Sequence, residues 1–251
     1  MKWRVGKWTL WKRKNGRARN NCKKSCGVFR NQKKKLSSKK ILITTGPTYE
    51  KIDPVRFIGN FSSGKMGFSL AEELASQGSQ IVLITGPTSL STQNSNIERI
   101  DVVSAQEMYE ASLKAFPTCD GGIMAAAVAD FTPLITETKK VKRGKENYSI
   151  ELTPTKDIAA SLGAIKSKNQ FLVGFALETN NEESNAKLKL EKKNLDFIVL
   201  NSLNDKGAGF QHDTNKITII NKRGESKKYE LKSKTEVAKD IVNELIAYYE
   251  E

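Results

Sequence analysis

Short apolar runs alternate with amphipathic segments from residue 39 to the end of the chain. Each run is short enough for a buried strand, and the segments between the runs repeat their apolar residues at helical spacing. The expected strands are 41–45, 81–85, 98–103, 122–128, 171–176 and 197–200, and the expected helices are 66–77, 104–115, 156–164, 181–194 and 234–250. This alternation predicts an α/β fold with a Rossmann-like open, mostly parallel sheet and helices on both faces.

Two local patterns add detail to this plan. Ser104 and Glu107 have the S-x-x-E spacing of a capping box, which indicates that a helix begins there. Residues 216–231 have the pattern of two strands joined through Arg223 and Gly224, which predicts a small antiparallel addition to the sheet near the C-terminus. Ligands of open α/β sheets bind outside the carboxyl ends of the strands, so functional side chains are expected in the segments that follow the strands.

The positive charge is concentrated at the N-terminus. The formal net charge is +14, from 42 Lys and Arg against 28 Asp and Glu. Residues 1–40 hold 16 of the basic residues and no acidic residue, which leaves 26 basic against 28 acidic residues in the remainder. We therefore divide the chain into a basic extension, 1–38, which is expected to be disordered, and a near-neutral domain, 39–251. A nucleic-acid-binding arm, a targeting segment and a translated region upstream of the real start are the alternatives for the extension, although basic runs are more often simply solvated.

Composition also bears on the compartment and on metals. No apolar run reaches the length of about 18 residues that a membrane span needs. The three cysteines are an odd number, and two of them lie in the extension, so the chain has no disulfide framework. His212 is the only histidine, which argues against a two-histidine metal site. These observations predict a cytoplasmic protein without membrane contact and without a metal held by its own side chains.

Residues 46–65 form an unusually long connection after the first expected strand, and loops of this length are often functional. The segment GNFSSGKM at 59–66 resembles the Walker A pattern, but Met66 stands where that pattern requires Ser or Thr. A glycine-rich backbone that runs into a helix still presents free N–H groups to an anion. We expect a phosphate cradle from Gly59, Ser62, Ser63, Gly64 and Lys65. A plain tight turn with a helix cap is the alternative.

A nucleotide-dependent reductase is a second interpretation of the same fold. The GxGxxG fingerprint is absent after the first strand, and the second strand runs into TGPT at 85–88, a repeat of TGPT at 45–48. NAD(P) binding is therefore disfavoured. Asp130 follows the small residues 125–129, where it could accept a hydrogen bond from a ribose or a nucleobase. Asp130 acting only as a cap beside a tightly packed strand is the alternative.

Six ordered segments together resemble one known family. They are DPVRFIGNFSSGKMG, AAAVADF, KKVKR, LTPTKDI, VGFALET and KLKLEKKNLDFIVLN, and they extend over about residues 39–250. In this order and spacing they resemble phosphopantothenoylcysteine synthetase, the ligase of coenzyme A biosynthesis. No flavin-dependent decarboxylase domain precedes them, so the resemblance indicates a stand-alone bacterial form with a separate phosphopantothenoylcysteine decarboxylase.

The resemblance implies a reaction and its residues. The reaction joins 4′-phosphopantothenate to L-cysteine through an acyl-cytidylate, consumes CTP with Mg²⁺ on the triphosphate, and releases pyrophosphate and CMP. The implied catalytic residues are Arg56, Asn60 and Lys140. The implied nucleotide-binding residues are Gly46, Ser62, Ser63, Gly64, Ala127, Asp130, Lys140, Asp157, Ile158, Ala159, Phe175, Lys189 and Lys193. The family is typically a homodimer, and the short runs around 148–152 and 216–231 could pair strands across subunits.

Overall fold

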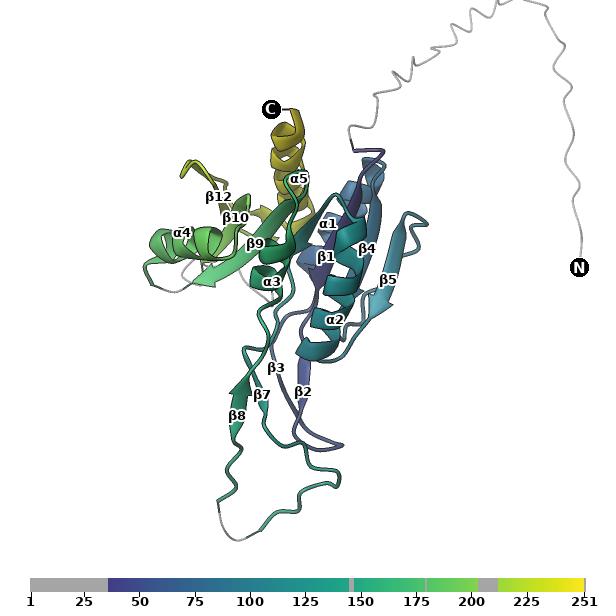
Figure 1. Ribbon diagram of the computed structural model, residues 1–251, viewed down its shortest axis with the longest axis vertical. Coiled ribbons are helices and arrows are strands. Elements are labelled where there is room, and N and C mark those ends of the chain that lie inside the picture. Colours follow the sequence, from purple (N-terminus) through teal and green to yellow (C-terminus); the bar gives the residue numbers. More distant parts are fainter. Residues whose placement is uncertain (1–35, 145–146, 179, 203–211, 251) are drawn as a thin grey trace, which may run out of the picture. The chain divides into compact units, whose positions relative to one another are not determined.

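An eight-stranded sheet forms the centre of the computed structural model, which describes residues 36–144, 147–178, 180–202 and 212–250 (Figure 1). Its strand order is β13-β12-β10-β9-β6-β1-β4-β5. The strands are β1 (Lys40–Thr45), β4 (Gln80–Thr85), β5 (Ile97–Asp101), β6 (Gly121–Met124), β9 (Phe171–Glu178), β10 (Phe197–Ser202), β12 (Ile217–Asn221) and β13 (Ser226–Lys228). The strands from β10 to β5 are parallel, and β12 and β13 add to them antiparallel.

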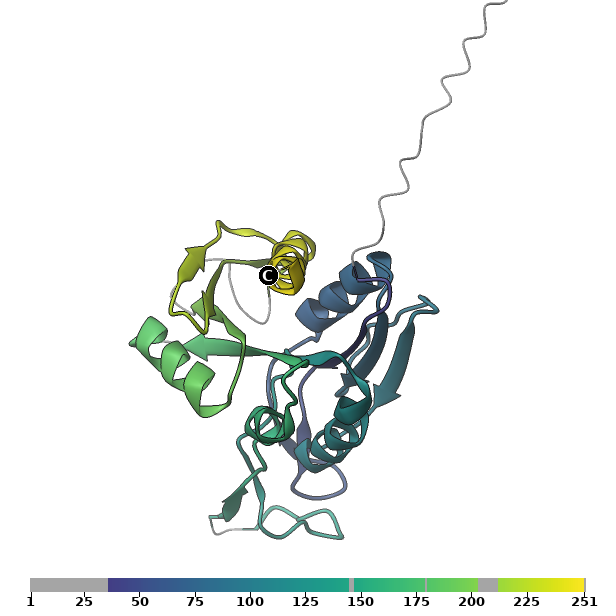
Figure 2. The same ribbon diagram turned by 45° about the horizontal axis from the view of Figure 1, so that its top comes forward.

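Helices cover both faces of this sheet, as Figures 1 and 2 show. The helices are α1 (Lys65–Ser76), α2 (Ala105–Ala115), α3 (Ile158–Ile165), α4 (Glu182–Lys192) and α5 (Lys234–Glu250). Strand residues alternate between the faces: Ile41 and Ile43 pack with α1 and α5, whereas Leu42 packs with α2, α3 and α4. The predicted fold class is therefore confirmed, with two apolar cores separated by the sheet.

The predicted elements match the observed ones apart from their ends. Ser104 caps α2, because its Oγ accepts from the Glu107 N–H at 3.2 Å, and the Glu107 carboxylate accepts from the Val103 N–H at 2.7 Å. The strand expected at 122–128 ends at Met124, although Ala127 still makes one parallel bridge, to Pro47. The helix expected at 181–194 ends at Lys192, so Lys193 is its C-cap residue. The antiparallel addition predicted at 216–231 is the pair β12–β13.

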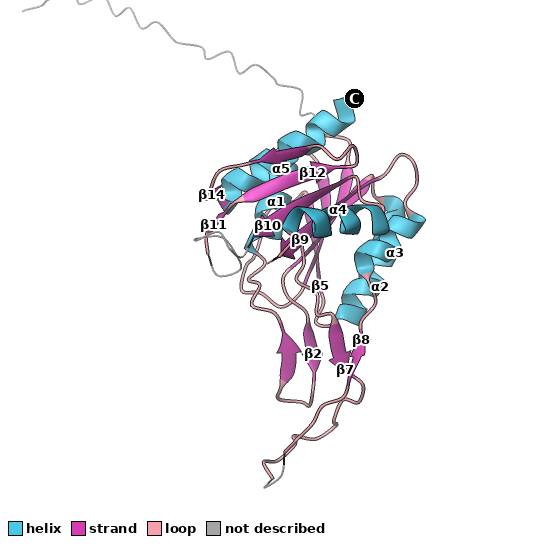
Figure 3. Ribbon diagram, turned by 90° about the vertical axis from the view of Figure 1, so that its left-hand side faces the viewer, coloured by secondary structure: helices cyan, strands magenta, loops and turns pink. Residues whose placement is uncertain are grey.

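Two short antiparallel ribbons extend from the carboxyl-end side of the sheet (Figure 3). One is β2 (Tyr49–Lys51) with β3 (Phe57–Gly59), and the other is β7 (Phe131–Pro133) with β8 (Leu152–Pro154). The long connection after β1 thus contains a hairpin where an irregular loop was expected. Residues 216–231, expected as strands for a subunit contact, pair with β10 inside the chain through β12. A third small pair, β11 (Thr214–Asn215) with β14 (Lys232–Ser233), precedes α5.

The folded body includes residues before the expected boundary at residue 39. Leu36 is 1% exposed and belongs to the core between the sheet and α1 and α5. Its carbonyl accepts from the Lys39 N–H at 3.0 Å and from the Ser79 hydroxyl at 3.2 Å. The boundary placed after residue 38 from the charge distribution is therefore too late, because Leu36 is an apolar core residue within a polar stretch.

Leu36 gives a test of this boundary. Removing residues 1–35 should leave the free energy of unfolding unchanged, whereas Leu36→Ala in the full chain should lower it by about 2–4 kcal/mol by leaving a cavity in the core. Urea unfolding followed by circular dichroism measures both. Leu188→Ala, at a side chain 63% exposed on α4, is the matched control and should change little. A large loss on removing residues 1–35, or none for Leu36→Ala, would contradict this boundary.

Candidate active site

The strand order reverses next to β1. The chain continues from β1 to β4 and β5 on one side, and then returns to β6, β9 and β10 on the other side. In open α/β sheets such a switch point leaves a crevice outside the carboxyl ends of the strands, where ligands bind. The segments that follow β1, β6, β9 and β10 meet here, and they carry most of the residues that the sequence singles out.

The two TGPT segments are paired turns at the ends of the adjacent strands β1 and β4. The Gly86 N–H donates to the Thr45 carbonyl at 2.9 Å. A Cβ atom at Gly86 would lie 1.6 Å from the Pro47 carbonyl oxygen, so only glycine allows this approach. Gly46 itself has a φ of 77°, a left-handed conformation that glycine adopts without strain. The two turns pack against each other but differ in conformation, since Gly46 has a positive φ and Gly86 does not.

The N-terminus of α1 packs against the first of these turns, where Gly64 lies next to Gly46. Gly64 has a φ of 82°, and its carbonyl accepts the first helical hydrogen bond, from the Phe68 N–H at 3.1 Å. The N–H groups of Lys65, Met66 and Gly67 precede this ladder, and these residues line the crevice. Such N–H groups and the helix dipole favour an anion. Of the expected phosphate cradle, Ser62, Ser63, Gly64 and Lys65 line the pocket, whereas Gly59 lies in β3 outside its lining.

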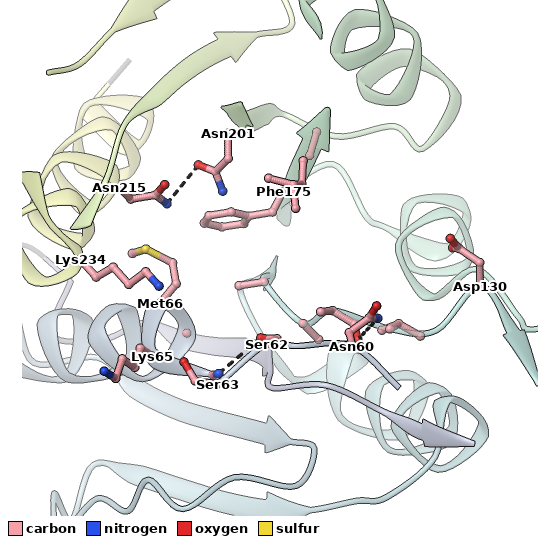
Figure 4. Close-up of a pocket in the computed structure, with 18 residues that line it drawn as sticks. Asn60, Ser62, Ser63, Lys65, Met66, Asp130, Phe175, Asn201, Asn215 and Lys234 are labelled. Atoms are coloured by element: carbon pink, nitrogen blue, oxygen red, sulfur yellow. Dashed lines mark hydrogen bonds between the residues drawn. The ribbon is translucent and has the colours of Figure 1, made fainter. Parts of the chain in front are cut away.

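The first of two adjoining pockets, the α1 pocket, has a volume of about 340 Å³ (Figure 4). It is lined by Asn60, residues 62–67, residues 125–128, Asp130, residues 175–177, Asn201, Asn215 and Lys234. Two hydrogen bonds organise its lower wall: Asn60 Nδ2 donates to the Ala127 carbonyl at 2.9 Å, and the Gly64 N–H donates to Ser62 Oγ at 3.3 Å. Lys65 Nζ forms an ion pair with Asp213.

The second pocket, the α3 pocket, has a volume of about 360 Å³. It is lined by Thr44, Met124, Ala126, Val128, Asp130, residues 155–159, Gly174, Phe175, Lys189, Lys193, Leu195 and Ile198. Two of its three lysines are held by carboxylates: Lys189 Nζ lies 2.6 Å from Glu178, and Lys193 Nζ lies 3.0 Å from Asp157. Burial raises the pKa of Asp157, but the Ala160 N–H and Lys193 outweigh it and lower that pKa. Asp157 therefore stays ionised at neutral pH.

Asp130 and Phe175 line both pockets, together with Ala126 and Val128. The pockets are therefore two compartments on either side of one ridge. The structure places Asn60, Ser62, Ser63, Gly64 and Ala127 in the α1 pocket, and Asp157, Ile158, Ala159, Lys189 and Lys193 in the α3 pocket. Gly46 lies under Gly64 and outside the lining of both pockets: a Cβ on Gly64 would be 3.5 Å from Gly46 Cα.

Arg56 and Lys140 also lie outside both pockets. The Arg56 guanidinium is bound by Asp53, with Nε 3.0 Å from the carboxylate, and it donates to the Val141 carbonyl at 3.0 Å. Asp53 is 1% exposed, and its hydrogen bond with Arg56 holds the pKa of Asp53 well below its usual range. Arg56 thus ties the β2–β3 turn to the segment that carries Lys140, away from the lining of both pockets.

Sequence reasoning missed three polar residues of the α1 pocket: Asn201, Asn215 and Lys234. Asn201 could have been found, because it directly follows the apolar run 197–200 at a strand end. Asn215 and Lys234 belong to the C-terminal segment and are brought in only by the packing of α5 against α1. In the described part of the chain, no cluster of three or more His, Cys, Asp or Glu side chains could hold a metal ion. Nor does any described helix have the length and apolarity that crossing a membrane requires.

The fold and the crevice define a Rossmann-like α/β protein with its ligand cleft at the strand ends. Residues 36–249 match the family described as DNA/pantothenate metabolism flavoprotein C-terminal domain, and the chain belongs to this family. A crystal structure of the C-terminal domain of coenzyme A biosynthesis bifunctional protein CoaBC is similar, with a TM-score of 0.74 and 39% identity. The similarity covers 86% of this chain and 98% of that domain.

Longer curated proteins are also similar. A protein named cysteine/cysteine sulfinic acid decarboxylase, from an unknown prokaryotic organism, is 56% identical over 213 residues, which are 85% of this chain and 59% of that protein. The bifunctional protein CoaBC of Haemophilus influenzae is 45% identical over 222 residues, 88% of this chain and 55% of that protein. This chain thus spans little more than half the length of these relatives, and the expected stand-alone form stays a prediction.

The approach of the two TGPT turns can be tested with a pair of glycine substitutions. Gly86→Ala should destabilise the protein by about 1–3 kcal/mol or more, because the new methyl group would overlap the Pro47 carbonyl. Gly224→Ala is the matched control: Gly224 has a φ of 80° but open space around it, so only backbone strain of about 1–2 kcal/mol is expected. Urea unfolding measures both. If the free energy of unfolding falls less for Gly86→Ala than for Gly224→Ala, the two TGPT turns can move apart at little cost.

Proposed function

We propose that this chain is a ligase that joins 4′-phosphopantothenate to L-cysteine with CTP. In the first step the substrate carboxylate attacks the α-phosphorus of CTP, and the bond to the β-phosphate breaks to release pyrophosphate. In the second step the cysteine amine attacks the acyl carbon of the acyl-cytidylate, loses a proton, and CMP leaves. Neither step needs a covalent nucleophile from the protein, so positioning and charge stabilisation are the expected contributions.

The observation that carries the proposal is the pair of adjoining pockets, in a chain of a pantothenate-metabolism family. A helix N-terminus at one pocket and two lysines at the other suit a triphosphate that crosses the ridge. Lys189 and Lys193 are already held at the α3 pocket by Glu178 and Asp157. On nucleotide binding their ammonium groups would turn to phosphate oxygens, where they would stabilise the charge of the departing pyrophosphate.

The remaining residues have proposed roles around this nucleotide. Asn60 lies in the lining beside Ala127 and would hold the acyl-cytidylate through its amide, which in the free protein donates to the Ala127 carbonyl. Arg56 would serve the phosphopantothenate carboxylate. Lys140 would meet the triphosphate, which requires its exposed segment to move toward the ridge from its position beside Arg56. Mg²⁺ would arrive on the triphosphate, held mainly by phosphate oxygens and water, as this ion prefers.

Two rival functions are distinguished by simple measurements. A reductase on this fold would bind NAD(P)H, and the missing glycine fingerprint argues against it. A nucleic-acid binder would act through the basic N-terminal segment, which lies outside the described residues except for Leu36, Ser37 and Ser38. Its binding would depend steeply on salt concentration and would disappear when residues 1–35 are removed.

The ligase proposal predicts pyrophosphate release from CTP that depends on 4′-phosphopantothenate, and CMP release that follows when cysteine is added. Lys189→Gln keeps the side-chain length but removes the charge proposed to meet the leaving pyrophosphate. It should slow pyrophosphate release by about 10²-fold, on the scale of losing one transition-state donor. Quenched time courses of both products measure this on the full chain.

Lys187→Gln is the matched control for Lys189→Gln. Lys187 lies on the same helix, α4, and is exposed outside the α3 pocket, so its loss removes the same charge without touching the proposed phosphate site. It should keep pyrophosphate release within about twofold of the unchanged chain. If both variants release pyrophosphate at equal rates, Lys189 does not belong to the nucleotide site. If the unchanged chain releases no pyrophosphate, the ligase proposal is wrong.

We also propose that the chain forms a homodimer through its two ribbons. Phe57, Phe131 and Ile135 are 50%, 50% and 72% exposed, and Phe61 and Leu152 on the same segments are exposed as well. Large exposed apolar side chains gathered on neighbouring segments are typical of an interaction site. The Leu134 N–H donates to the Glu151 carbonyl and the Glu137 N–H to the Ile52 carbonyl, so the segment Leu134–Glu137 joins the two hairpins that carry these side chains.

Light scattering coupled to gel filtration tests the dimer. Ile135→Glu should convert the dimer to a monomer at micromolar concentration, because it places a charge in the proposed apolar contact. Leu188→Glu is the control: Leu188 is similarly exposed, at 63%, but lies on α4 away from the ribbons. If the unchanged chain is a monomer, the proposed homodimer does not form. If the Ile135→Glu variant stays dimeric, the ribbons are not the dimer contact.

A further inference from the structure

Asp53 is a buried carboxylate in the otherwise exposed turn between β2 and β3. Its side chain has 0% exposed surface, whereas the next three residues, 54–56, are all exposed. Its Oδ1 accepts from the N–H groups of Val55 and Arg56, both at 2.8 Å. Its Oδ2 accepts from Arg56 Nε and Nη2 and from the Val141 N–H. The two oxygens of one carboxylate thus have two different sets of donors.

Only Oδ1 is needed to close the turn. An Asp or Asn side chain that accepts from N–H groups two and three residues further on is a usual turn-forming contact. Oδ2 has partners of another kind, a guanidinium and a backbone N–H that lies 88 residues away in the sequence. The local turn therefore explains half of the contacts of Asp53, and the other half requires a further explanation.

Val141 is held at both of its backbone polar groups. Its N–H donates to Asp53 Oδ2 at 3.1 Å, and its carbonyl accepts from Arg56 Nη2 at 3.0 Å. Earlier in the same segment, the Glu137 N–H donates at 2.9 Å to a carbonyl of the β2–β3 turn. The residues between these two anchors form no helix or strand, so the anchors determine where the backbone of Lys140 lies.

The same carboxylate oxygen orients Arg56. Nε and Nη2 both donate to it, so the guanidinium cannot turn freely. Among the described residues none accepts from Nη1, and the side chain is 45% exposed. Arg56 therefore presents Nη1 to an anionic ligand in a fixed orientation.

We infer that Asp53 is a positioning residue, whose Oδ2 holds the Arg56 guanidinium and the Lys140 segment together as one unit. We call these hydrogen bonds of Oδ2 with Arg56 and Val141 the Asp53 clamp. The unit offers two cations at a fixed spacing to two anionic groups, a carboxylate and a triphosphate. The inference rests on the proposed function for the roles of Arg56 and Lys140, whereas the clamp itself is measurable without the reaction.

The clamp also relates the unit to the α1 pocket. The β2–β3 turn continues into β3, and Asn60 in the pocket lining directly follows β3. Because Val141 is bound at both its N–H and its carbonyl, a movement that brings Lys140 to the ridge would bring Arg56 with it. The carboxylate and the triphosphate would then meet their cations in one step.

Hydrogen exchange tests the clamp without any activity. Asp53→Asn keeps Oδ1 for the turn but sets an amide NH₂ group against the donors of Arg56 and Val141. The Val141 N–H, followed by NMR spectroscopy, should exchange at least about tenfold faster in this variant, while the amides of β1 keep their rates. If the Val141 N–H is unprotected in the unchanged chain, or exchanges equally fast in both chains, the inference is wrong.

Asp101→Asn is the matched control. Asp101 accepts from Arg99 Nε at 3.0 Å and from Arg99 Nη2 at 2.7 Å, but it lies in the edge strand β5 and outside both pockets. The variant thus breaks the same kind of pair elsewhere on the sheet. Its Val141 exchange rate and its rate of pyrophosphate release should stay within about twofold of the unchanged chain, because exposed pairs contribute little.

Steady-state kinetics test the positioning role. In Asp53→Asn the KM for 4′-phosphopantothenate should rise and the kcat of pyrophosphate release should fall, each by about tenfold or more, because both cations are misplaced. The Kd for CTP, measured by calorimetry, should change little, since Asp53 lines neither pocket. A purely structural Asp53 would lower the folded fraction and kcat with KM unchanged, and an equal rise in KM and Kd would show a general disturbance; either result overturns the inference.

A double variant tests whether Asp53 acts through Lys140. In Lys140→Gln no charge is left to be placed, so adding Asp53→Asn should lower kcat little further, although the KM for 4′-phosphopantothenate still rises. If the two losses in kcat multiply, Asp53 acts independently of Lys140 and the inference is wrong. If hydrogen exchange shows the clamp but the unchanged chain releases no pyrophosphate, the ligase proposal and the positioning role are wrong, and only the clamp is upheld.

Discussion

The hydroxyl of Thr45, at the end of β1, donates to the Gly64 carbonyl at 2.9 Å, and this contact fixes where α1 begins. The fit is close: a Cβ atom on Gly67, in the first turn of the helix, would lie 2.2 Å from the same hydroxyl oxygen. The first turn of α1 therefore rests directly on the central strand, and its N–H groups face the crevice. The turn at Gly46 packs against both Gly64 and the turn at Gly86. The contact between Thr45 and Gly64 therefore positions the helix start that lines the α1 pocket.

Two lysine side chains in the α3 pocket are oriented by ion pairs with neighbouring carboxylates. Lys189 forms an ion pair with Glu178, and Lys193 forms one with Asp157. Both lysine side chains are therefore ordered before a ligand binds, and an anionic ligand would only replace the carboxylate partners. Half-exposed pairs of this kind contribute little to stability. Under the proposed function, these pairs hold two cations in the lining of the α3 pocket, where the phosphates of a nucleotide would take the place of the carboxylates.

Local sequence signals were enough for the architecture and for the part of the cleft beside the N-terminus of α1. The period of the apolar runs, the Ser104 cap and the glycine-rich approach to α1 are all local, and each gave the correct element. Leu36 was missed because a single apolar residue in a basic stretch has no periodicity. Asn215 and Lys234 were missed because they reach the pocket through the packing of α5 on α1, which no local pattern encodes. The ribbon strands are three residues each, too short for periodicity to reveal.

Leu36 lies just before the amino end of β1, whereas the cleft opens at the carboxyl ends of the strands. The polypeptide thus joins the body at the edge of the sheet remote from the cleft. A segment attached there can change in length, charge or identity without altering any residue that lines either pocket. The described body can therefore be joined to another N-terminal segment without a change in the lining of either pocket.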